Sequence, residues 1–123
     1  MKYEGVTHKI IGCALNVHNT LGNGFQEVIY QRAMKIEMYK HDIAFSREHE
    51  MEIYYDEIKI GKRRVDFFVE DIIMVELKAI TKLEHVHLAQ IKNYLEAYNL
   101  EVGLLINFGA RSLQFNRIYN KTK

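Results

Sequence analysis

The chain lacks the features that mark several classes of protein. Its 123 residues contain one cysteine and neither proline nor tryptophan. A single cysteine excludes an internal disulfide and a Cys-x-x-Cys metal site, and we interpret Cys13 as a small core residue because free cysteine is among the most buried residue types. No Ser/Gly-rich linker, low-complexity tract or repeat marks an internal boundary. We therefore expect one domain over residues 1–123.

Long apolar runs and an excess of charge of one sign are also missing. No stretch approaches the roughly 18 consecutive apolar residues of a membrane span. The start of the chain, MKYEGVTHKI, lacks the apolar core of a secretory signal. We expect a soluble cytoplasmic protein without a membrane partner. The net charge of +1 provides no overall field that would attract phosphate, so contacts with nucleic acid must come from a local patch or a partner.

The apolar periodicity predicts a mixture of helices and strands. Apolar residues recur at spacings of three and four over residues 5–21, which predicts an amphipathic helix, and Gly22 and Gly24 end it. The further predicted elements are a helix over 25–39, a strand over 43–55 that continues at 58–60, strands over 64–69 and 72–79, a helix over 83–98, and strands over 102–107 and 113–118. The order ααβββαββ predicts an α/β fold.

Two opposite charges interrupt an otherwise apolar strand. Glu76 and Lys78 stand two residues apart, so both side chains leave the same face of the sheet. Burying such charges is costly before their pairing returns part of the free energy. A structural Glu–Lys pair is therefore the alternative to a functional site.

Asp66 precedes Glu76 on the neighbouring strand of an expected hairpin. A two-residue loop at Glu70 and Asp71 would place Asp66 opposite Val75, on the wrong face, whereas a three-residue loop or one bulge places it opposite Glu76. We predict the longer loop or the bulge. The two carboxylates then have Cβ atoms about 5 Å apart and repel each other unless a cation lies between them. Mg²⁺ (or Mn²⁺) is the expected cofactor, because these ions prefer carboxylate, carbonyl and water oxygens.

Lys78 projects beside the expected ion. There it would orient or deprotonate an attacking water and offset the charge that develops on a phosphate. Hydrolysis of a phosphodiester requires both tasks. We therefore predict that Asp66, Glu76 and Lys78 are catalytic.

Further motifs follow the same order along the chain. They are residues 24–30 (GFQEVIY), 64–66 (RVD), 75–79 (VELKA), 90–95 (QIKNYL) and 103–108 (GLLINF). Together they resemble the family named for its G-x-x-E-x-x-Y motif, a branch of the PD-(D/E)XK nuclease superfamily. The resemblance implies a restriction-endonuclease-like core, with a central mixed sheet flanked by helices and metal bound where Asp66 and Glu76 meet. The expected metal ligands are these two side chains and the backbone carbonyl of Leu77, with Glu27 acting through a water.

Glu27 and Tyr30 lie three residues apart on one helical face, just after Gly24. A carboxylate near a helix N-terminus is favoured by the helix dipole, so Glu27 is either a helix-capping charge or a third, catalytic carboxylate. Tyr30 is either a packed aromatic residue with a satisfied hydroxyl or a residue that binds substrate.

Gln90 and Tyr94 line one stripe of the helix that follows the lysine strand, together with His87. The stripe resembles the Gln-x-x-x-Tyr helix of part of the superfamily, which supports the metal site and backbone phosphates. We predict that Gln90 is catalytic and that Tyr94 binds substrate.

Lys62 and Arg64 belong to the densest basic stretch, immediately before Asp66. We predict that they bind substrate, because phosphate contacts there would place a nucleic-acid backbone against the metal. A strand edge protected by charge is the alternative.

The resulting hypothesis is a divalent-metal-dependent nuclease, with DNA favoured as its substrate. So small a core has little room to grip a duplex, which favours a homodimer. The alternatives are a non-catalytic module that keeps the fold and binds nucleic acid or a protein partner, and a purely structural acidic pair.

Overall fold

The computed structural model of the chain describes residues 3–121. Two helices open the fold, α1 (Glu4–Leu21) and α2 (Glu27–Lys40). Gly22 follows α1 with a φ of 76°, in the left-handed region that glycine adopts without steric cost. The predicted succession of helix, glycine break and helix is confirmed, although α2 begins at Glu27 rather than at residue 25.

Five strands form one sheet, and they are neighbours in the order in which they occur in the chain. They are β1 (Phe45–Tyr55), β2 (Ile58–Val69), β3 (Ile73–Lys78), β4 (Val102–Asn107) and β5 (Gln114–Tyr119). β3 and β4 are parallel and are connected through helix α3 (His85–Ala97), and the other neighbours are antiparallel. The mixed sheet and the order ααβββαββ confirm the predicted fold class. Residues 58–60 and 64–69, predicted as separate pieces, belong to one strand because β1 pairs with β2 on both sides of Gly61.

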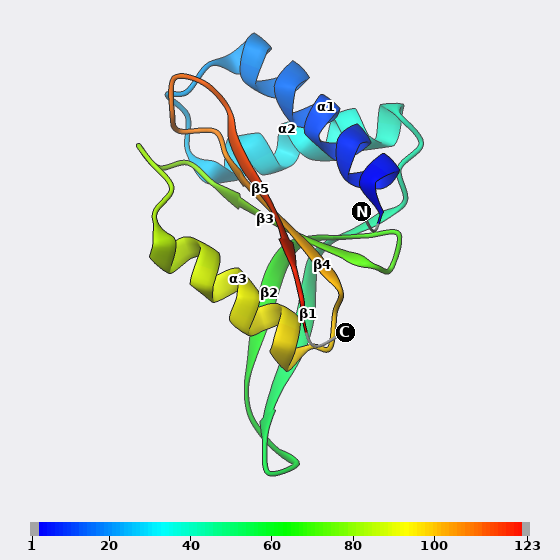
Figure 1. Ribbon diagram of the computed structural model, residues 1–123. Coiled ribbons are helices and arrows are strands. Elements are labelled where there is room, and N and C mark those ends of the chain that lie inside the picture. The colour runs from blue at the N-terminus through cyan, green and yellow to red at the C-terminus, as the bar shows by residue number, and fades with distance from the viewer. Residues whose placement is uncertain (1–2, 122–123) are drawn as a thin grey trace.

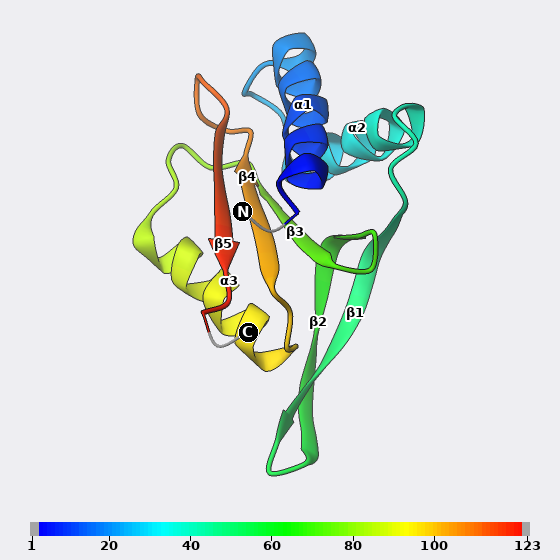
Figure 2. The same cartoon turned by 45° about the vertical axis from the view of Figure 1, so that its right-hand side comes forward.

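Helices cover both faces of the sheet. Figure 2 shows α1 and α2 on one side of the strands and α3 on the other. Tyr30 and Met34 of α2 pack with Phe67 of β2 in the first core, whereas Ile91 and Leu95 of α3 belong to a second core. No helix within residues 3–121 is long and apolar enough to cross a membrane.

The loop between β2 and β3 is the longer of the two alternatives. Val69 pairs with Ile73, which leaves three residues between them, and the Ile72 N–H donates to the Val69 carbonyl at 3.0 Å. Glu70 and Asp71 adopt φ values of 54° and 56° in this turn. The predicted loop length is thus confirmed, and the pairing extends as far as Phe67 and Val75, the neighbours of Asp66 and Glu76.

The alternation of β2 between the two faces reverses at Asp66. Val65 belongs to the core on the α3 side and Phe67 to the core on the α1–α2 side, although residues two apart in a regular strand share a face. On the neighbouring strand β1, Glu48 has a φ of 53° at the same level. The reversal places Arg63, rather than Arg64, on the face that carries Glu76.

The outer half of the β1–β2 hairpin projects beyond the rest of the sheet (Figure 1). Its turn at Asp56 and Glu57 has φ values of 50° and 65°, and two successive left-handed residues suit the right-handed twist of a hairpin. Tyr55 and Ile58, which flank the turn, are 69% and 67% exposed. Only the inner half of the hairpin contributes to the site below.

Candidate active site

Asp66 lies where β2 separates from β3. The last paired residues of these strands are Phe67 and Val75, and beyond them the Leu77 N–H donates to Asp66 Oδ2 at 2.8 Å. Gln31 of α2 donates through Nε2 to Asp66 Oδ1 at 2.7 Å. Asp66 is therefore oriented from two directions, by the backbone of β3 and by a helix on one face of the sheet.

Glu76 is 3% exposed, which is unusual for a glutamate. Its Oε2 accepts a hydrogen bond from Arg63 Nη2 at 2.9 Å, and the Arg63 guanidinium lies 4.5 Å from the centre of the Tyr94 ring. Glu76 Oε1 and Arg63 Nε are buried and have no hydrogen-bond partner within residues 3–121. The pair thus leaves one buried acceptor and one buried donor open.

Glu27 is the first residue of α2, where the helix dipole favours a negative charge. Although Glu27 is exposed as a residue, partial desolvation of its carboxyl group raises its pKa, and the neighbouring Asp66 raises it further, whereas Lys78 and Arg63 lower it. Because Asp66 also acts on Glu76, the three carboxylates form one electrostatically coupled group.

Burial also governs the other two carboxyl groups. It raises the pKa of Asp66 in spite of the hydrogen bonds from Leu77 and Gln31. Burial and then repulsion from Asp66 raise the pKa of Glu76 to about 7, although Arg63 opposes the rise. A site in which three acids disfavour their charged forms is one that a cation stabilises.

Lys78 ends β3 and is half-buried beside Asn107 of β4. Its charge lowers the pKa of Glu27, Asp66 and Glu76 alike. The structure therefore brings together four of the residues predicted to be catalytic, Glu27, Asp66, Glu76 and Lys78.

Tyr30 is fully buried, so its expected role in binding substrate is corrected. Its hydroxyl donates to the Gly22 carbonyl at 2.6 Å and accepts the Phe25 N–H at 3.1 Å, and its ring stacks on Phe108 with centroids 4.7 Å apart. The alternative of a packed aromatic residue with a satisfied hydroxyl is the one observed. Tyr30 fixes the loop that leads into Glu27.

The residues predicted on α3 separate into different environments. The Tyr94 ring contacts the Arg63 guanidinium, and Arg63 in turn binds Glu76, so Tyr94 is linked to this carboxylate through the arginine. Gln90 is exposed, and no contact places it against the carboxylates. His87 accepts the Glu84 N–H through Nδ1 at 2.9 Å in a capping box, which is a structural role at the start of the helix.

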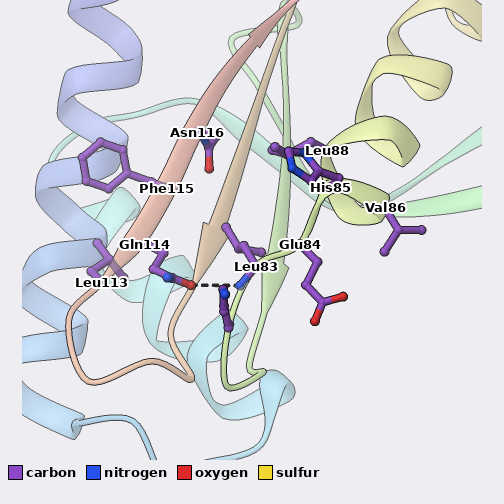
Figure 3. Close-up of a pocket in the computed structure, with 10 residues that line it drawn as sticks. Leu83, Glu84, His85, Val86, Leu88, Leu113, Gln114, Phe115 and Asn116 are labelled. Carbon is purple, nitrogen blue, oxygen red and sulfur yellow. Dashed lines mark hydrogen bonds between the residues drawn. The ribbon is translucent and has the colours of Figure 1, made fainter.

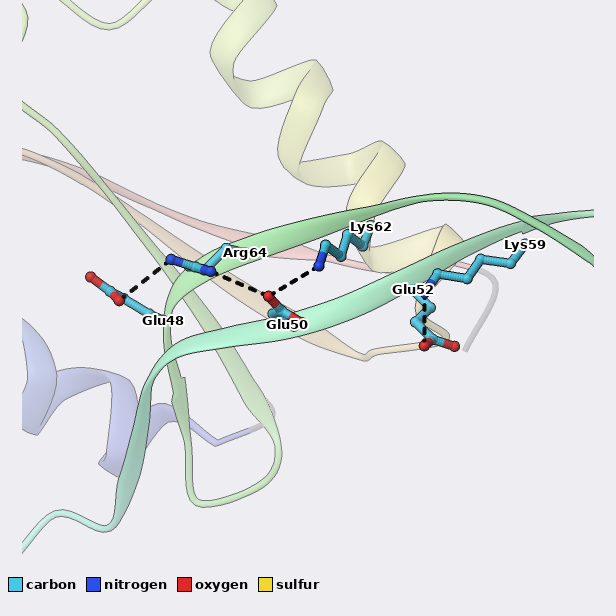
Figure 4. Close-up of polar contacts among 6 residues, drawn as sticks. All are labelled: Glu48, Glu50, Glu52, Lys59, Lys62 and Arg64. Atoms are coloured by element: carbon cyan, nitrogen blue, oxygen red, sulfur yellow. Dashed lines mark hydrogen bonds and ion pairs between the residues drawn. The ribbon is translucent and has the colours of Figure 1, made fainter.

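Lys62 and Arg64 point away from Glu76, contrary to expectation. Lys62 pairs with Glu50, and Arg64 pairs with both Glu50 and Glu48. Figure 4 shows these pairs following one another along the outer surface of the hairpin. In a strand with regular alternation, residues 62, 64 and 66 would share one face, and the reversal at Asp66 separates Lys62 and Arg64 from it. Their charges are balanced by acidic neighbours, so this surface does not present a basic patch.

Two residues that contact the carboxylates were not predicted to do so. Gln31 lies four residues after Glu27 and thus on the same helical face, a spacing that could have identified it. Arg63 stands between Lys62 and Arg64 in the basic stretch, but its contact with Glu76 depends on the strand irregularity, for which the sequence carries no signal.

A pocket lies two strands away from Lys78 at the same end of the sheet. The loop before α3, the first turn of α3 and β5 form it (Figure 3). Gln114 in its wall accepts hydrogen bonds from the Leu83 N–H at 3.0 Å and from Asn107 Nδ2 at 2.9 Å. None of the three carboxylates lines it, so the pocket borders the candidate site without containing its acidic groups.

The carboxylates suit a hard divalent ion that keeps most of its waters. Within residues 3–121, no group of three or more His, Cys, Asp and Glu side chains is placed so that it could hold a metal ion, so Glu27, Asp66 and Glu76 do not form a three-residue metal site. Magnesium needs fewer protein ligands, because it binds through one or two carboxylates and completes its octahedron with water and substrate oxygens. Glu76 Oε1 fits this requirement, because it is buried and has no hydrogen-bond partner within residues 3–121. Each Asp66 oxygen also retains a lone pair beyond its single hydrogen bond.

Comparison with known proteins identifies a family and a related fold. The family model of the PD-(D/E)XK nuclease superfamily matches residues 4–118. The crystal structure of SSO0001 is similar to this chain with a TM-score of 0.61 and 18% sequence identity, over 97% of this chain. The match spans 60% of the SSO0001 chain, and at this identity it shows a shared fold alone. No curated protein matches the sequence.

Proposed function

Because the chain belongs to the PD-(D/E)XK nuclease superfamily, we propose that it is a divalent-metal-dependent nuclease that hydrolyses phosphodiester bonds, with DNA as the favoured substrate. One observation carries the proposal. Asp66 and Glu76 converge from adjacent strands, and Glu76 keeps a buried oxygen without a partner in the described chain. Such an oxygen is costly unless a ligand satisfies it.

The proposed ion is Mg²⁺ or Mn²⁺, in keeping with the divalent metals that nucleases of this superfamily typically use. Asp66, Glu76 and the backbone carbonyl of Leu77 would hold it, with Glu27 acting through a water. When bound, the ion supplies an activated water and neutralises charge on the phosphate.

The remaining tasks belong to side chains of the site. Lys78 orients or deprotonates the attacking water and offsets the charge that develops on the phosphate. Gln31 and the Leu77 N–H keep Asp66 in one orientation. Gln90, exposed on α3, is proposed to contact the substrate backbone.

We also propose that the chain belongs to the G-x-x-E-x-x-Y branch of the superfamily. The motif has a physical basis here: Tyr30 binds the backbone at Gly22 and Phe25. This fixes the start of α2, and Glu27 at that start lies near Asp66. The tyrosine would then act on the reaction through the position of the glutamate.

A cleavage assay tests the proposal. Labelled single- and double-stranded DNA and RNA are incubated with the protein, with Mg²⁺, with Mn²⁺ or with EDTA. We expect metal-dependent cleavage by the wild type and none by Lys78→Ala or Asp66→Ala, with metal binding retained in the lysine variant and lost in the aspartate variant. Metal-dependent cleavage that survives in both variants would refute the assigned site.

The second candidate is a non-catalytic module with the nuclease fold. The exposed apolar side chains at the tip of the hairpin, Tyr55, Ile58 and Ile60, favour it, because they suit a protein partner or a second copy in a homodimer. Binding of all four nucleic-acid probes without cleavage, or association through the hairpin alone, would support this candidate over the nuclease.

A further inference from the structure

Arg63 makes an incomplete contact with Glu76. Arginine and a carboxylate commonly form two parallel hydrogen bonds, which give the pair its strength and geometry. Here one bond is formed, from Nη2 to Oε2 at 2.9 Å. Glu76 Oε1 and Arg63 Nε remain buried without partners within residues 3–121.

A purely structural ion pair explains this arrangement poorly. Removing two charges from water is repaid only when the remaining lone pairs and protons are also satisfied. The two open atoms have complementary capacities: Oε1 can accept a cation, and Nε can donate to an anion. Each partner therefore carries a polar atom that the other does not satisfy.

The two partners also differ in their access to solvent. The Arg63 side chain is 31% exposed, whereas that of Glu76 is 4% exposed. The Tyr94 ring lies against the guanidinium and holds it by a cation–π contact. A large anionic ligand approaching the sheet can thus reach Arg63, while Glu76 lies deeper.

The Arg63 charge acts on the whole acidic group. It favours the charged forms of Glu27, Asp66 and Glu76. Arg63 therefore supplies positive charge at the place where a divalent ion would supply it.

We propose that Arg63 has two partners in succession: the Glu76 carboxylate while no metal is bound, and a phosphate oxygen of the nucleic acid once Glu76 holds a divalent ion. In the first state Arg63 competes with the metal, and in the second it binds substrate. The inference rests on the proposed function and deepens it, because it names the side chain that recognises the phosphate beside the metal.

The first half is tested by titrating Mn²⁺ in a calorimeter without nucleic acid. Arg63→Gln removes the competing charge, so it should bind Mn²⁺ severalfold more tightly than the wild type. Arg63→Lys keeps the charge and should bind close to the wild type. Arg64→Gln, a neighbouring substitution on the opposite face, should match the wild type. Equal or weaker Mn²⁺ binding by Arg63→Gln would overturn the proposal, because a residue that only supports Glu76 would give that result.

The second half is tested in a Lys78→Ala background, in which cleavage should be too slow to consume the probe during the measurement. Binding of a fluorescein-labelled duplex DNA is followed by anisotropy in Mg²⁺ at several salt concentrations. Adding Arg63→Gln should weaken binding severalfold and reduce the slope of log K against log salt by about one, as expected for one lost phosphate contact. Arg63→Lys should restore the slope. An unchanged affinity and slope would contradict the phosphate contact.

The two proposals fail differently. If Mn²⁺ binds the wild type and Asp66→Ala equally, the metal site itself is refuted and the role of Arg63 with it. If Mn²⁺ binding depends on Asp66 but is not tightened by Arg63→Gln, only the role of Arg63 is refuted. Melting curves of both Arg63 variants establish that they are folded.

Discussion

Arg63 and Arg64 are neighbours on β2, and both pair with glutamates, but in opposite environments. Arg63 contacts the buried Glu76, whereas Arg64 contacts Glu50, whose side chain is 46% exposed, in the chain of surface ion pairs in Figure 4. Water and salt screen the surface pairs, which contribute little to stability. The buried pair lies among desolvated carboxylates, where each charge alters the others. The electrostatic environment of these two arginines therefore depends on burial more than on the density of charge.

The largest expected effect is a difference in cleavage rate between two lysine variants, one at Lys78 beside the acidic group and one at Lys62 among the surface ion pairs of the hairpin. Lys78→Ala should lower the rate of phosphodiester cleavage by about 10²–10⁴-fold, the contribution typical of a group that assists proton transfer. Lys62→Ala should lower it by less than about tenfold, because Lys62 points away from Glu76 and pairs with Glu50. Single-turnover cleavage rates of the two variants measure the difference. Equal losses of cleavage rate in the two variants would show that the surface ion pairs of the hairpin take part in the reaction.

The second prediction concerns the pH dependence of stability. The pKa of Glu76 is raised from 4.5 to about 7 in the folded protein. Its contribution to stability is therefore fully present below about pH 4.5 and is lost as the pH rises through 7. The wild-type Tm should fall over this interval, by an amount corresponding to at most about 3 kcal/mol. Glu76→Gln, which does not titrate, should show a shallower fall.

Glu50→Gln is the matched control for this experiment. The hydrogen bond from Arg64 and the nearby Lys62 lower the pKa of the exposed Glu50, so its neutralisation should leave the fall of Tm between pH 5 and 8 as steep as in the wild type. A Glu76→Gln protein whose Tm falls as steeply as that of Glu50→Gln would contradict the assigned burial of Glu76.

A smaller effect is expected from the helix side of the site. Gln31→Ala removes the hydrogen bond to Asp66 Oδ1 and should weaken Mn²⁺ binding by about 10–100-fold, as is typical when the partner of a metal ligand is removed. Calorimetric titration measures this change. Gln26→Ala, just before α2, is the control, since its side chain has no assigned contact with Asp66 and should leave the affinity unchanged. An unaltered affinity in Gln31→Ala would show that the backbone of β3 orients Asp66 alone.

The smallest effect is expected on the surface. Arg64→Gln breaks two exposed ion pairs and should leave the Tm unchanged within the error of a melting experiment, at low and at high salt. If Arg64→Gln clearly lowered the Tm at low salt but not at high salt, the surface ion pairs of the hairpin would stabilise the protein as a network.

The sequence was sufficient for the elements, their order and the length of the loop between β2 and β3, because these follow from apolar periodicity and from a choice between two loop lengths. It was insufficient for the faces of β2. At the level of this reversal, Glu48 on the neighbouring strand β1 has a left-handed backbone conformation, which glutamate rarely adopts. Position in the basic stretch alone therefore did not show that Arg63, rather than Arg64, contacts Glu76.

The helical motif was predicted in part. The spacing of Glu27 and Tyr30 identifies one face, but spacing does not distinguish a residue at the site from one that supports it. The Tyr30 ring packs on Phe108, and its hydroxyl can be buried because it binds the backbone at Gly22 and Phe25, in the loop after α1. Such contacts depend on how that loop folds, which residue spacing does not predict. Gln31, one residue later, reaches Asp66 instead.

The proposed nuclease activity requires that Asp66 and Glu76 hold a divalent ion. The most direct measurement is a thermal melt of the wild type and of Asp66→Ala at pH 8, with and without Mn²⁺. A ligand that binds only the folded state stabilises it by about 2.7 kcal/mol at a concentration 100 times its Kd, which is a readily measured rise in Tm. We predict that Mn²⁺ raises the Tm of the wild type and leaves that of Asp66→Ala unchanged. The same response to Mn²⁺ in both proteins would contradict the account.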